Sequence, residues 1–356
     1  MAMKKHNFSA GPSILPQEVM QQASQGLLDF NNSGLSIMEI SHRSKDFIEV
    51  MDQACALALD LLGLDSGEYS ALFLQGGAST QFVMAPYNFL NNKAAYLNTG
   101  TWSSKAIKEA KLFGEVNEVA SSKDQNFSYI PKGYHIPEDS DYFHCTSNNT
   151  IFGTQIQQLP ETSVPVFCDM SSDIFSRVLD YSKFDLIYAG AQKNMGPAGT
   201  TLVVIKNDLL GDAPRAIPSM LDYRVHQEKG SMFNTPPVVA VYVSLLTLKW
   251  LSDKGGVSAI ELINREKADQ LYSEIDRNAL FKGFANLEDR SLMNATFNLT
   301  DDSQKATFDA LCKEAGISGI NGHRSVGGYR ASIYNAMPLE SVQVLIEVMK
   351  EFERRA

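Results

Sequence analysis

Polar side chains follow five predicted strands of this chain, and together they could bind and activate a small molecule. They are Gln75-Gly76-Gly77-Ala78-Ser79, Thr101-Trp102, Ser147-Asn148-Asn149-Thr150, Asp169 and Gln192-Lys193. In an open parallel sheet, ligands bind beyond the carboxyl ends of the strands. These segments therefore offer one site a phosphate-binding turn, a flat aromatic ring, a hydroxyl, a carboxylate and a lysine. Loops are polar in most proteins, so each segment alone is a weak signal.

Lys193 is the residue best suited to covalent chemistry. It follows an apolar run and precedes Gly196-Pro197-Ala198-Gly199, so a tight turn is expected to hold it at a strand end. An amine shielded from water loses affinity for its proton, and the neutral amine is a nucleophile towards aldehydes. The alternative is a solvated loop lysine, but apolar strands flank this one.

Asp169 ends an apolar strand and lies 193 − 169 = 24 residues before Lys193. A buried carboxylate needs a cationic or hydrogen-bonding partner, and the pyridinium nitrogen of pyridoxal phosphate would supply one. Trp102 could stack on such a ring, although a tryptophan of the core is almost as compatible with its position.

The glycine pair Gly76-Gly77 stands between a strand and a helix start, where free N–H groups and the helix dipole attract a phosphate. The sequence contains neither a dinucleotide fingerprint nor a Walker loop. Two further pairs, His42-Arg43 and His323-Arg324, lie on loops containing Ser and Gly. In an acidic protein they suggest pockets for a small anion, since Arg offers a bidentate fork. Surface salt bridges are the alternative.

The elements that must position these residues alternate between short apolar runs and amphipathic helices, which predicts an α/β sheet with crossover helices. The predicted strands cover residues 69–74, 93–98, 141–146, 165–169, 185–190 and 201–205. A long helix is predicted to begin at the N-cap candidate Thr235, with Pro236 in its first turn, and to end near Gly255.

The region after Gly255 has a different texture. A helix is predicted over residues 257–277, followed by β-like stretches at 292–299 and 328–334 and helices at 303–315 and 339–354. We therefore expect a domain boundary near Gly255.

Composition narrows the class of protein. The chain has 356 residues, of which 31 are basic and 41 acidic, giving a net charge of −10 that disfavours nucleic-acid binding. This length favours two domains. The sequence contains no apolar run of the ~18–20 residues that a membrane span needs and no signal peptide. Four scattered cysteines show no metal-binding spacing and indicate a reducing compartment. We expect a soluble cytoplasmic protein that binds neither a membrane nor a metal.

Together these segments resemble the phosphoserine aminotransferase family, which belongs to the class V aminotransferases of the fold-type I pyridoxal-phosphate enzymes. The likeness covers essentially the whole chain and is carried by residues 7–12, 40–44, 75–79, 148–155, 169–172, 192–199, 234–236 and 322–332. It implies a large domain (16–255) with a mostly parallel seven-stranded sheet flanked by helices. A smaller α+β domain (256–356) and an N-terminal segment (1–15) that packs with it would complete the fold.

The likeness also implies roles for single residues in binding the cofactor, pyridoxal 5'-phosphate. Lys193 would hold the cofactor covalently, and Asp169 would pair with its ring nitrogen. Trp102 would stack on the ring, and Thr150 would hydrogen-bond its phenolic oxygen. The cofactor phosphate would be held by Ala78, Ser79 and Gln192, joined by Asn234 and Thr235 from a second subunit.

For the substrates, the likeness implies that Arg330 binds the α-carboxylate. The distal phosphate or carboxylate would be surrounded by His42, Arg43, His323 and Arg324, some of them across a dimer interface, with Ser9 nearby. The activity implied is amino transfer between L-glutamate and 3-phosphohydroxypyruvate, giving O-phospho-L-serine and 2-oxoglutarate in L-serine biosynthesis. A homodimer with shared sites is implied as well.

Alternatives stay open at this stage. The chain could also form 4-phosphohydroxy-L-threonine in pyridoxine biosynthesis, or it could be another fold-type I enzyme, such as an alanine–glyoxylate aminotransferase or a cysteine desulfurase. A desulfurase needs a mobile cysteine, whereas Cys145 and Cys168 lie in predicted strands. A non-catalytic anion- or nucleotide-binding module would be colourless when purified, whereas a cofactor joined to Lys193 should make the protein yellow.

Overall fold

A seven-stranded sheet forms the centre of the computed structural model, which describes residues 5–159, 161–211, 213–324 and 326–356. The strand order is β2-β10-β9-β8-β5-β3-β4, and β10 is antiparallel to both neighbours while the other pairs are parallel. The strands are β2 (Tyr69–Leu74), β3 (Lys93–Asn98), β4 (Glu115–Ser121), β5 (Phe143–Thr146), β8 (Val166–Asp169), β9 (Leu186–Gly190) and β10 (Thr201–Lys206).

The inner strands are buried on both faces, which explains why they are continuous apolar runs in the sequence. All six predicted strands occur. The prediction missed β4, which pairs only with β3 at the edge of the sheet and exposes Glu115 and Glu118. Charged side chains are typical of edge strands because they discourage pairing with other chains. The same charges remove the apolar signal that identifies a strand.

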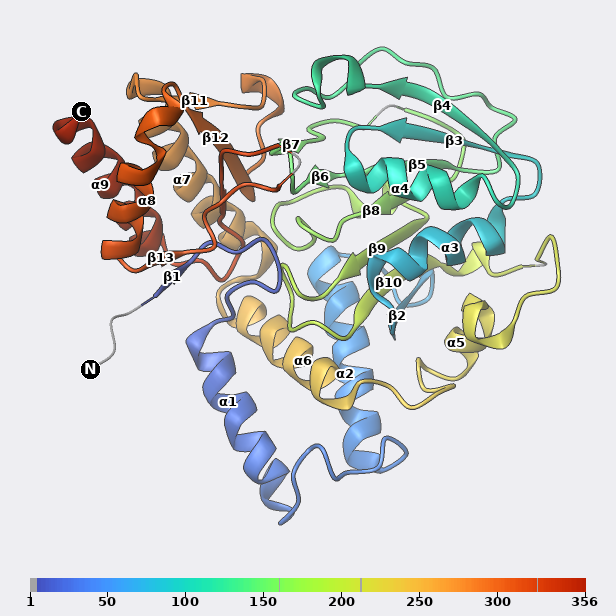
Figure 1. Cartoon of the computed structure of the whole chain (residues 1–356). Helices are drawn as coiled ribbons and strands as arrows, with labels where there is room; N and C mark the ends of the chain where they lie inside the picture. The colour runs from blue at the N-terminus through green and yellow to red at the C-terminus, as the bar shows by residue number, and fades with distance from the viewer. Residues whose placement is uncertain (1–4, 160, 212, 325) are drawn as a thin grey trace.

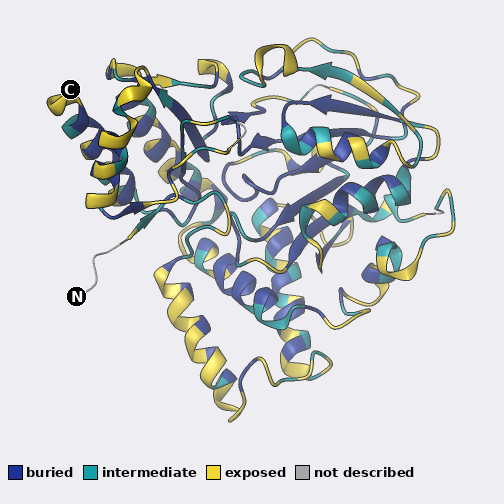
Figure 2. Cartoon of the chain, viewed as in Figure 1, coloured by how far each residue is buried: buried dark blue, intermediate teal, exposed yellow. Residues whose placement is uncertain are grey.

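Helices cover both faces of this sheet (Figure 1). The helices α3 (Gly77–Phe89) and α4 (Thr101–Ala110) pack on one face, and α2 (Lys45–Leu62) and α6 (Val238–Asp253) on the other. The helix α1 (Gln17–Leu28) packs on α6, and its outer surface is exposed, as Figure 2 shows. A short helix, α5 (Tyr223–Glu228), lies near α3.

The start of α6 differs from the prediction. The helix begins at Val238, and its N-cap is Pro237 and not Thr235. The residue before a proline is disfavoured in helical conformation, and here Thr235 and Pro236 both precede one. The carbonyl of Thr235 instead accepts a hydrogen bond of 2.6 Å from Gln75 Nε2, which ties this segment to the loop after β2.

The C-terminal part has a core of its own. Its elements are α7 (Gly256–Arg277), β11 (Phe281–Gly283), β12 (Asn294–Leu299), α8 (Lys305–Glu314), β13 (Ile317–Ser318), β14 (Tyr329–Ser332) and α9 (Leu339–Arg355). β12 pairs with β11 and β14 in an antiparallel sheet. Phe8 inserts into this core, next to β1 (His6–Asn7), which pairs in parallel with β13. The boundary near Gly255 stays a prediction.

Shorter elements join these layers. A two-stranded hairpin follows β5, formed by β6 (Asn148–Asn149) and β7 (Thr154–Gln155). Single 3-10 turns occur at Phe30–Asn32, Lys123–Gln125, Tyr181–Lys183, Asn207–Leu209, Ser219–Leu221, Leu287–Asp289 and Asp302–Gln304. Within the described ranges, no helix is long and apolar enough to cross a bilayer.

Candidate active site

A cavity of about 330 Å³ lies beyond the carboxyl ends of the central strands, where it was expected. It is lined by Ala10, Gly11, Gly77, Ala78, Ser79, Trp102, Thr150, Ile151, Asp169, Ser171, Gln192, Lys193, His323 and Arg330. The large sheet, the hairpin after β5, the N-terminal segment and the C-terminal part all contribute to this wall. The cavity therefore unites segments that are far apart in the sequence.

Lys193 lies in the turn after β9, with its side chain half-buried in the cavity. Its Nζ donates a hydrogen bond of 3.0 Å to Thr150 Oγ1 and lies 5.6 Å from the centre of the Trp102 ring. Burial lowers the pKa of this amine, the nearby Asp169 opposes that effect and Arg330 reinforces it. A lowered pKa increases the share of the neutral, nucleophilic amine.

Asp169 is the last residue of β8 and only 4% exposed. Its Oδ1 accepts a hydrogen bond of 2.9 Å from the amide of Ser171, and it makes no ion pair with any residue that the structure describes. Burial raises the pKa of this carboxyl group, while Lys193 and the Ser171 hydrogen bonds lower it. A carboxylate so far from water is expected to have a protonated or cationic partner within the cavity.

The start of α3 forms a glycine turn of the kind that can bind a phosphate. Gly76 and Gly77 have φ values of 94° and 68°, in the left-handed region that favours glycine. A Cβ at Gly76 would collide with the side chain of Thr80. The turn presents Ala78 and Ser79 to the cavity in the first turn of a 13-residue helix, where amide groups are free to bind an anion.

The C-terminal part contributes positively charged side chains to the cavity. Arg330, on β14, donates from Nη1 to the carbonyl of Thr150 at 3.5 Å, while its Nε has no partner among the described residues. The pKa of His323 is lowered by burial and further by Arg330, Arg324 and Lys105. Mutual repulsion of these cations indicates that an anion would be bound favourably between them.

Six of the predicted site residues do not line this cavity within one chain. His42 and Arg43 lie just before α2, and Arg324 is exposed. Ser9 packs against Gly319. Asn234 lines a separate cavity of about 280 Å³ beside Gly76, and Thr235 lies next to it.

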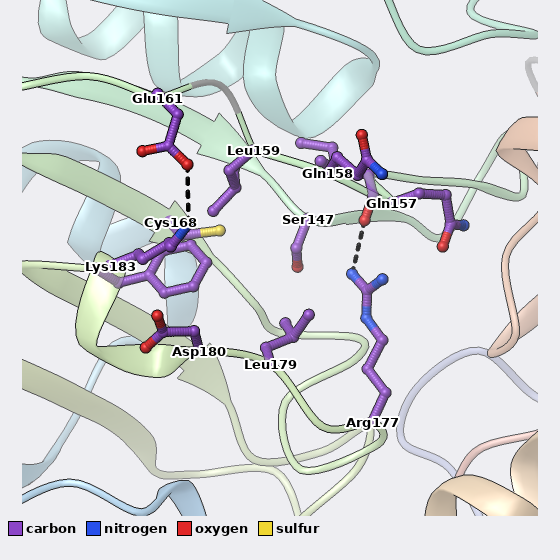
Figure 3. Close-up of a pocket in the computed structure, with 12 residues that line it drawn as sticks. Ser147, Gln157, Gln158, Leu159, Glu161, Cys168, Arg177, Leu179, Asp180 and Lys183 are labelled. Atoms are coloured by element: carbon purple, nitrogen blue, oxygen red, sulfur yellow. Dashed lines mark hydrogen bonds and ion pairs between the residues drawn. The ribbon is translucent and has the colours of Figure 1, made fainter.

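A second cavity, of about 340 Å³, lies beside Cys168 of β8 (Figure 3). Two cations reach it, and both are paired. Arg177 Nη2 donates to the carbonyl of Ile156 at 2.8 Å and lies 3.3 Å from Asp173 Oδ2. Lys183 forms an ion pair of 3.1 Å with Glu161. Because these charges are already neutralised, the Lys193 cavity is the better candidate for an anionic substrate.

Sequence reasoning missed four of the lining residues, namely Ala10, Gly11, Ile151 and Ser171. Ser171 had a usable signal, because a strand-end Asp followed two residues later by Ser is a common turn in which the carboxylate accepts the backbone N–H. The others act through their backbone or their bulk, and no side-chain chemistry distinguishes them.

The fold and the site define a class of enzymes, and comparison with known proteins identifies it. The chain matches the aminotransferase class-V family over residues 5–345 and belongs to that family. Over 355 residues it is 70% identical to phosphoserine aminotransferase of Flavobacterium johnsoniae. The alignment covers 99% of this chain and 100% of the relative. Within the class, the chain is therefore a member of the phosphoserine aminotransferases.

Solved structures agree with this assignment. The phosphoserine aminotransferase of Bacillus circulans subsp. alkalophilus is 44% identical, with a TM-score of 0.96 and coverage of 99% of each chain. The PLP-bound enzyme of Trichomonas vaginalis is 37% identical, with a TM-score of 0.92, covering 98% of this chain and 100% of the other. The predicted family, fold class and enzyme class are confirmed, and the predicted cofactor is confirmed as pyridoxal phosphate.

The cysteines argue against desulfurase chemistry. Cys145 and Cys168 are fully buried on neighbouring strands, with their sulfur atoms 3.6 Å apart. Burial raises the pKa of Cys168 well above its usual value. A buried, protonated thiol inside a strand cannot swing onto a substrate.

Proposed function

We propose that this chain transfers the α-amino group of L-glutamate to 3-phosphohydroxypyruvate, giving 2-oxoglutarate and O-phospho-L-serine. The observation that carries the proposal is the Lys193 amine, whose pKa is lowered by burial and which lies in one cavity with Asp169, Trp102 and Arg330. An amine, an acid and an arginine fork are the groups that amino transfer on a carboxylate substrate requires.

The cavity fits pyridoxal phosphate. Asp169 is buried without an ion-pair partner among the described residues, which suits a pyridinium nitrogen. The Trp102 ring faces the cavity, and its indole Nε1 likewise has no partner in the described part of the chain. The first turn of α3 suits the phosphate. Lys193, Asp169, Trp102, Thr150, Ala78, Ser79 and Gln192 would hold the cofactor.

When bound, pyridoxal phosphate supplies an aldehyde that joins amines and a ring that withdraws electrons from the substrate α-carbon. Asp169 holds a proton at the ring nitrogen and so maintains this withdrawal. Lys193 takes the α-proton as a general base and returns it as a general acid. Thr150 accepts the hydrogen bond of the amine and keeps it aimed into the cavity. The surrounding walls restrict water, which strengthens these charge interactions.

Arg330 binds the α-carboxylate, and the remaining basic residues bind the distal group of the substrate. That group is a carboxylate in L-glutamate and a phosphate in 3-phosphohydroxypyruvate, so one pocket must accept both. Several cations lie near His323 and lower its pKa by repulsion. Such a group of cations can bind both a carboxylate and a phosphate better than the guanidinium of one arginine can.

A second copy of the chain would complete the pocket. His42, Arg43, Asn234 and Thr235 lie outside the cavity of their own chain. Large apolar side chains shortly before His42 are exposed, with Leu28 at 75% and Met38 at 67%. Exposed apolar surface of this kind is typical of subunit interfaces. We propose a homodimer in which each subunit contributes to the other's site.

A glutamate-dependent assay with 3-phosphohydroxypyruvate tests the proposal. The purified, cofactor-loaded chain should form O-phospho-L-serine, and Lys193→Ala should lose turnover together with the visible absorption of the bound cofactor. Lys111→Ala, which removes an exposed lysine after α4, should behave like the unmodified enzyme. Borohydride treatment followed by peptide mapping should find the pyridoxyl group on Lys193. Labelling of another lysine, or turnover by Lys193→Ala, would refute the proposed role.

A further inference from the structure

A short stretch near the N-terminus connects Lys193 to the C-terminal part of the molecule. We call residues 8–13 the N-terminal strap. On one side the amide of Ser13 donates to the carbonyl of Gln192 at 2.9 Å, and its hydroxyl donates to the carbonyl of Lys193. Gly11 lies against the lysine itself, since a Cβ placed there would be 3.4 Å from Lys193 Cγ. The strap therefore supports both the backbone and the side-chain stem of Lys193.

On its other side the strap is attached to β14 and the residues that follow. The amide of Ser332 donates to the carbonyl of Phe8 at 3.2 Å, and the Tyr334 hydroxyl donates to the carbonyl of Ala10 at 2.7 Å. Figure 1 shows the N-terminal segment running beside the C-terminal elements before it turns towards the large sheet. The Tyr334 hydroxyl thus binds the residue immediately before Gly11, the glycine that lies against Lys193.

The Tyr334 side chain is held in place from several directions. It is 1% exposed, and its hydroxyl accepts a hydrogen bond of 3.2 Å from Asn294 Nδ2. Burial raises the pKa of Tyr334 to about 12, although hydrogen bonds from Asn294 and Thr150 lower it. The phenol therefore keeps its proton and donates it to the Ala10 carbonyl over the whole physiological pH range.

The backbone of Tyr334 is fixed as well. Lys267, a buried residue of α7, donates from Nζ to the carbonyls of Tyr334 at 2.7 Å and Ile333 at 3.0 Å. The amide of the next residue, Asn335, donates a hydrogen bond of 2.9 Å to Oδ1 of Asn194, which directly follows Lys193 in the sequence. The backbone on both sides of Tyr334 is therefore held by hydrogen bonds.

We propose that Tyr334 is a positioning residue for Lys193: by holding the Ala10 carbonyl, its hydroxyl sets where the N-terminal strap, and with it the Lys193 side chain, stands in the cavity. The inference rests on the proposed function only for its kinetic readout. Because Arg330 lies on the same segment, the strap also links the residue that binds the carboxylate to the residue that moves the proton. Misplacing such a group by about 1 Å can cost on the order of a hundredfold in rate.

The test compares Tyr334→Phe with Tyr329→Phe in the cofactor-loaded enzyme. Tyr329 is a matched control, because it is also buried on this segment and its hydroxyl donates to Asp309 at 2.8 Å, away from the strap. We expect Tyr334→Phe to lower kcat by roughly ten- to a hundredfold while KM for L-glutamate stays within about threefold. Tyr329→Phe should leave kcat within about twofold of the unmodified enzyme, since it changes no contact of Lys193.

A second measurement does not depend on turnover. Full-length protein freed of cofactor is mixed with pyridoxal phosphate, and its attachment to Lys193 is followed by visible absorbance and confirmed by borohydride mapping. Tyr334→Phe should slow attachment and shift the pH midpoint of the absorbance by about half a unit or more, as a displaced amine would. Tyr329→Phe should do neither. Equal behaviour of the two variants in both measurements would overturn the inference, whereas an unmodified enzyme that binds cofactor without amino transfer would overturn only the proposed function.

Discussion

At the scale of single residues, the site depends on two buried groups that shift each other's proton affinity. Burial raises the pKa of Asp169 and lowers that of Lys193, and the attraction between the two opposes both effects. In the mechanism that we propose, Asp169 would keep the cofactor ring electron-poor and Lys193 would move the proton.

Replacing Asp169 by Asn tests this division of work. The amide keeps the shape and the hydrogen bond from Ser171, but it cannot keep a proton on the ring nitrogen. We expect the transition-state free energy to rise by about 2–4 kcal/mol, with a corresponding fall in kcat. This cost is typical of losing one preorganised polar group in a site shielded from water. The measurement is steady-state kinetics, with cofactor content determined by absorbance. An unchanged kcat at full cofactor occupancy would contradict the role.

Four residues that were expected at the site were the easiest to place in the cavity from the sequence. Lys193, Asp169, Trp102 and Thr150 lie at strand ends, where the position in the sequence and the residue type point the same way. Tyr334 and Lys267 were missed because nothing in a single sequence says that an amine inside an amphipathic helix will reach a carbonyl near the end of the chain. Such contacts follow from tertiary packing, which local patterns do not encode.

At the scale of elements, the contact between α7 and the segment after β14 is unusual because it uses a lysine. Lys267 is 0% exposed and has no carboxylate partner among the described residues. Its two acceptors match the two donors of a neutral amine, whereas an ammonium group would leave its third hydrogen without a partner. Burial lowers the pKa of Lys267 to about 7.

This arrangement predicts a pH dependence of stability. Between pH 7 and 10.5 the unfolded chain holds a proton on Lys267 that the folded chain lacks, so its contribution to folding improves as pH rises. Below pH 7 both states are protonated and the contribution is constant. We expect the unfolding free energy of the natural chain, relative to Lys267→Met, to rise by up to about 1.4 kcal/mol per pH unit across this range. Denaturant unfolding at several pH values measures it; parallel curves for both proteins would argue that the amine is not neutral.

The order of elements could be predicted from the sequence, but two boundaries show where the pattern failed. The edge strand β4 carries charges that remove its apolar signal, and α6 begins only at Val238, after two consecutive prolines that disfavour a helical conformation of the residues before them. Because Thr235 precedes the helix, its carbonyl can accept the hydrogen bond of Gln75, which lies next to the glycine turn at the start of α3.

At the scale of the whole molecule, the proposed sharing of sites can be tested by mixing two inactive variants. Lys193→Ala lacks the amine. Arg43→Ala lacks an anion-binding group, and its loss should weaken the binding of phosphorylated substrates by about 2–4 kcal/mol. If Arg43 serves the opposite subunit, a mixed dimer has one complete site, and an equal mixture should recover about a quarter of full activity. The variants are unfolded together, refolded and assayed. If Arg43 acts within its own subunit, no recovery follows.

The attachment of the N-terminal strap to β14 constrains how the enzyme can be made. Phe8 is buried in the C-terminal core, and Ala10 is bound by Tyr334, so these two residues of the strap find their partners only after the C-terminal part has been synthesised. The strands that carry Lys193 and Asp169 are synthesised earlier, but the wall beside them can form only after more than a hundred further residues. A nascent or C-terminally shortened chain would thus contain the reactive lysine without the pocket that controls it.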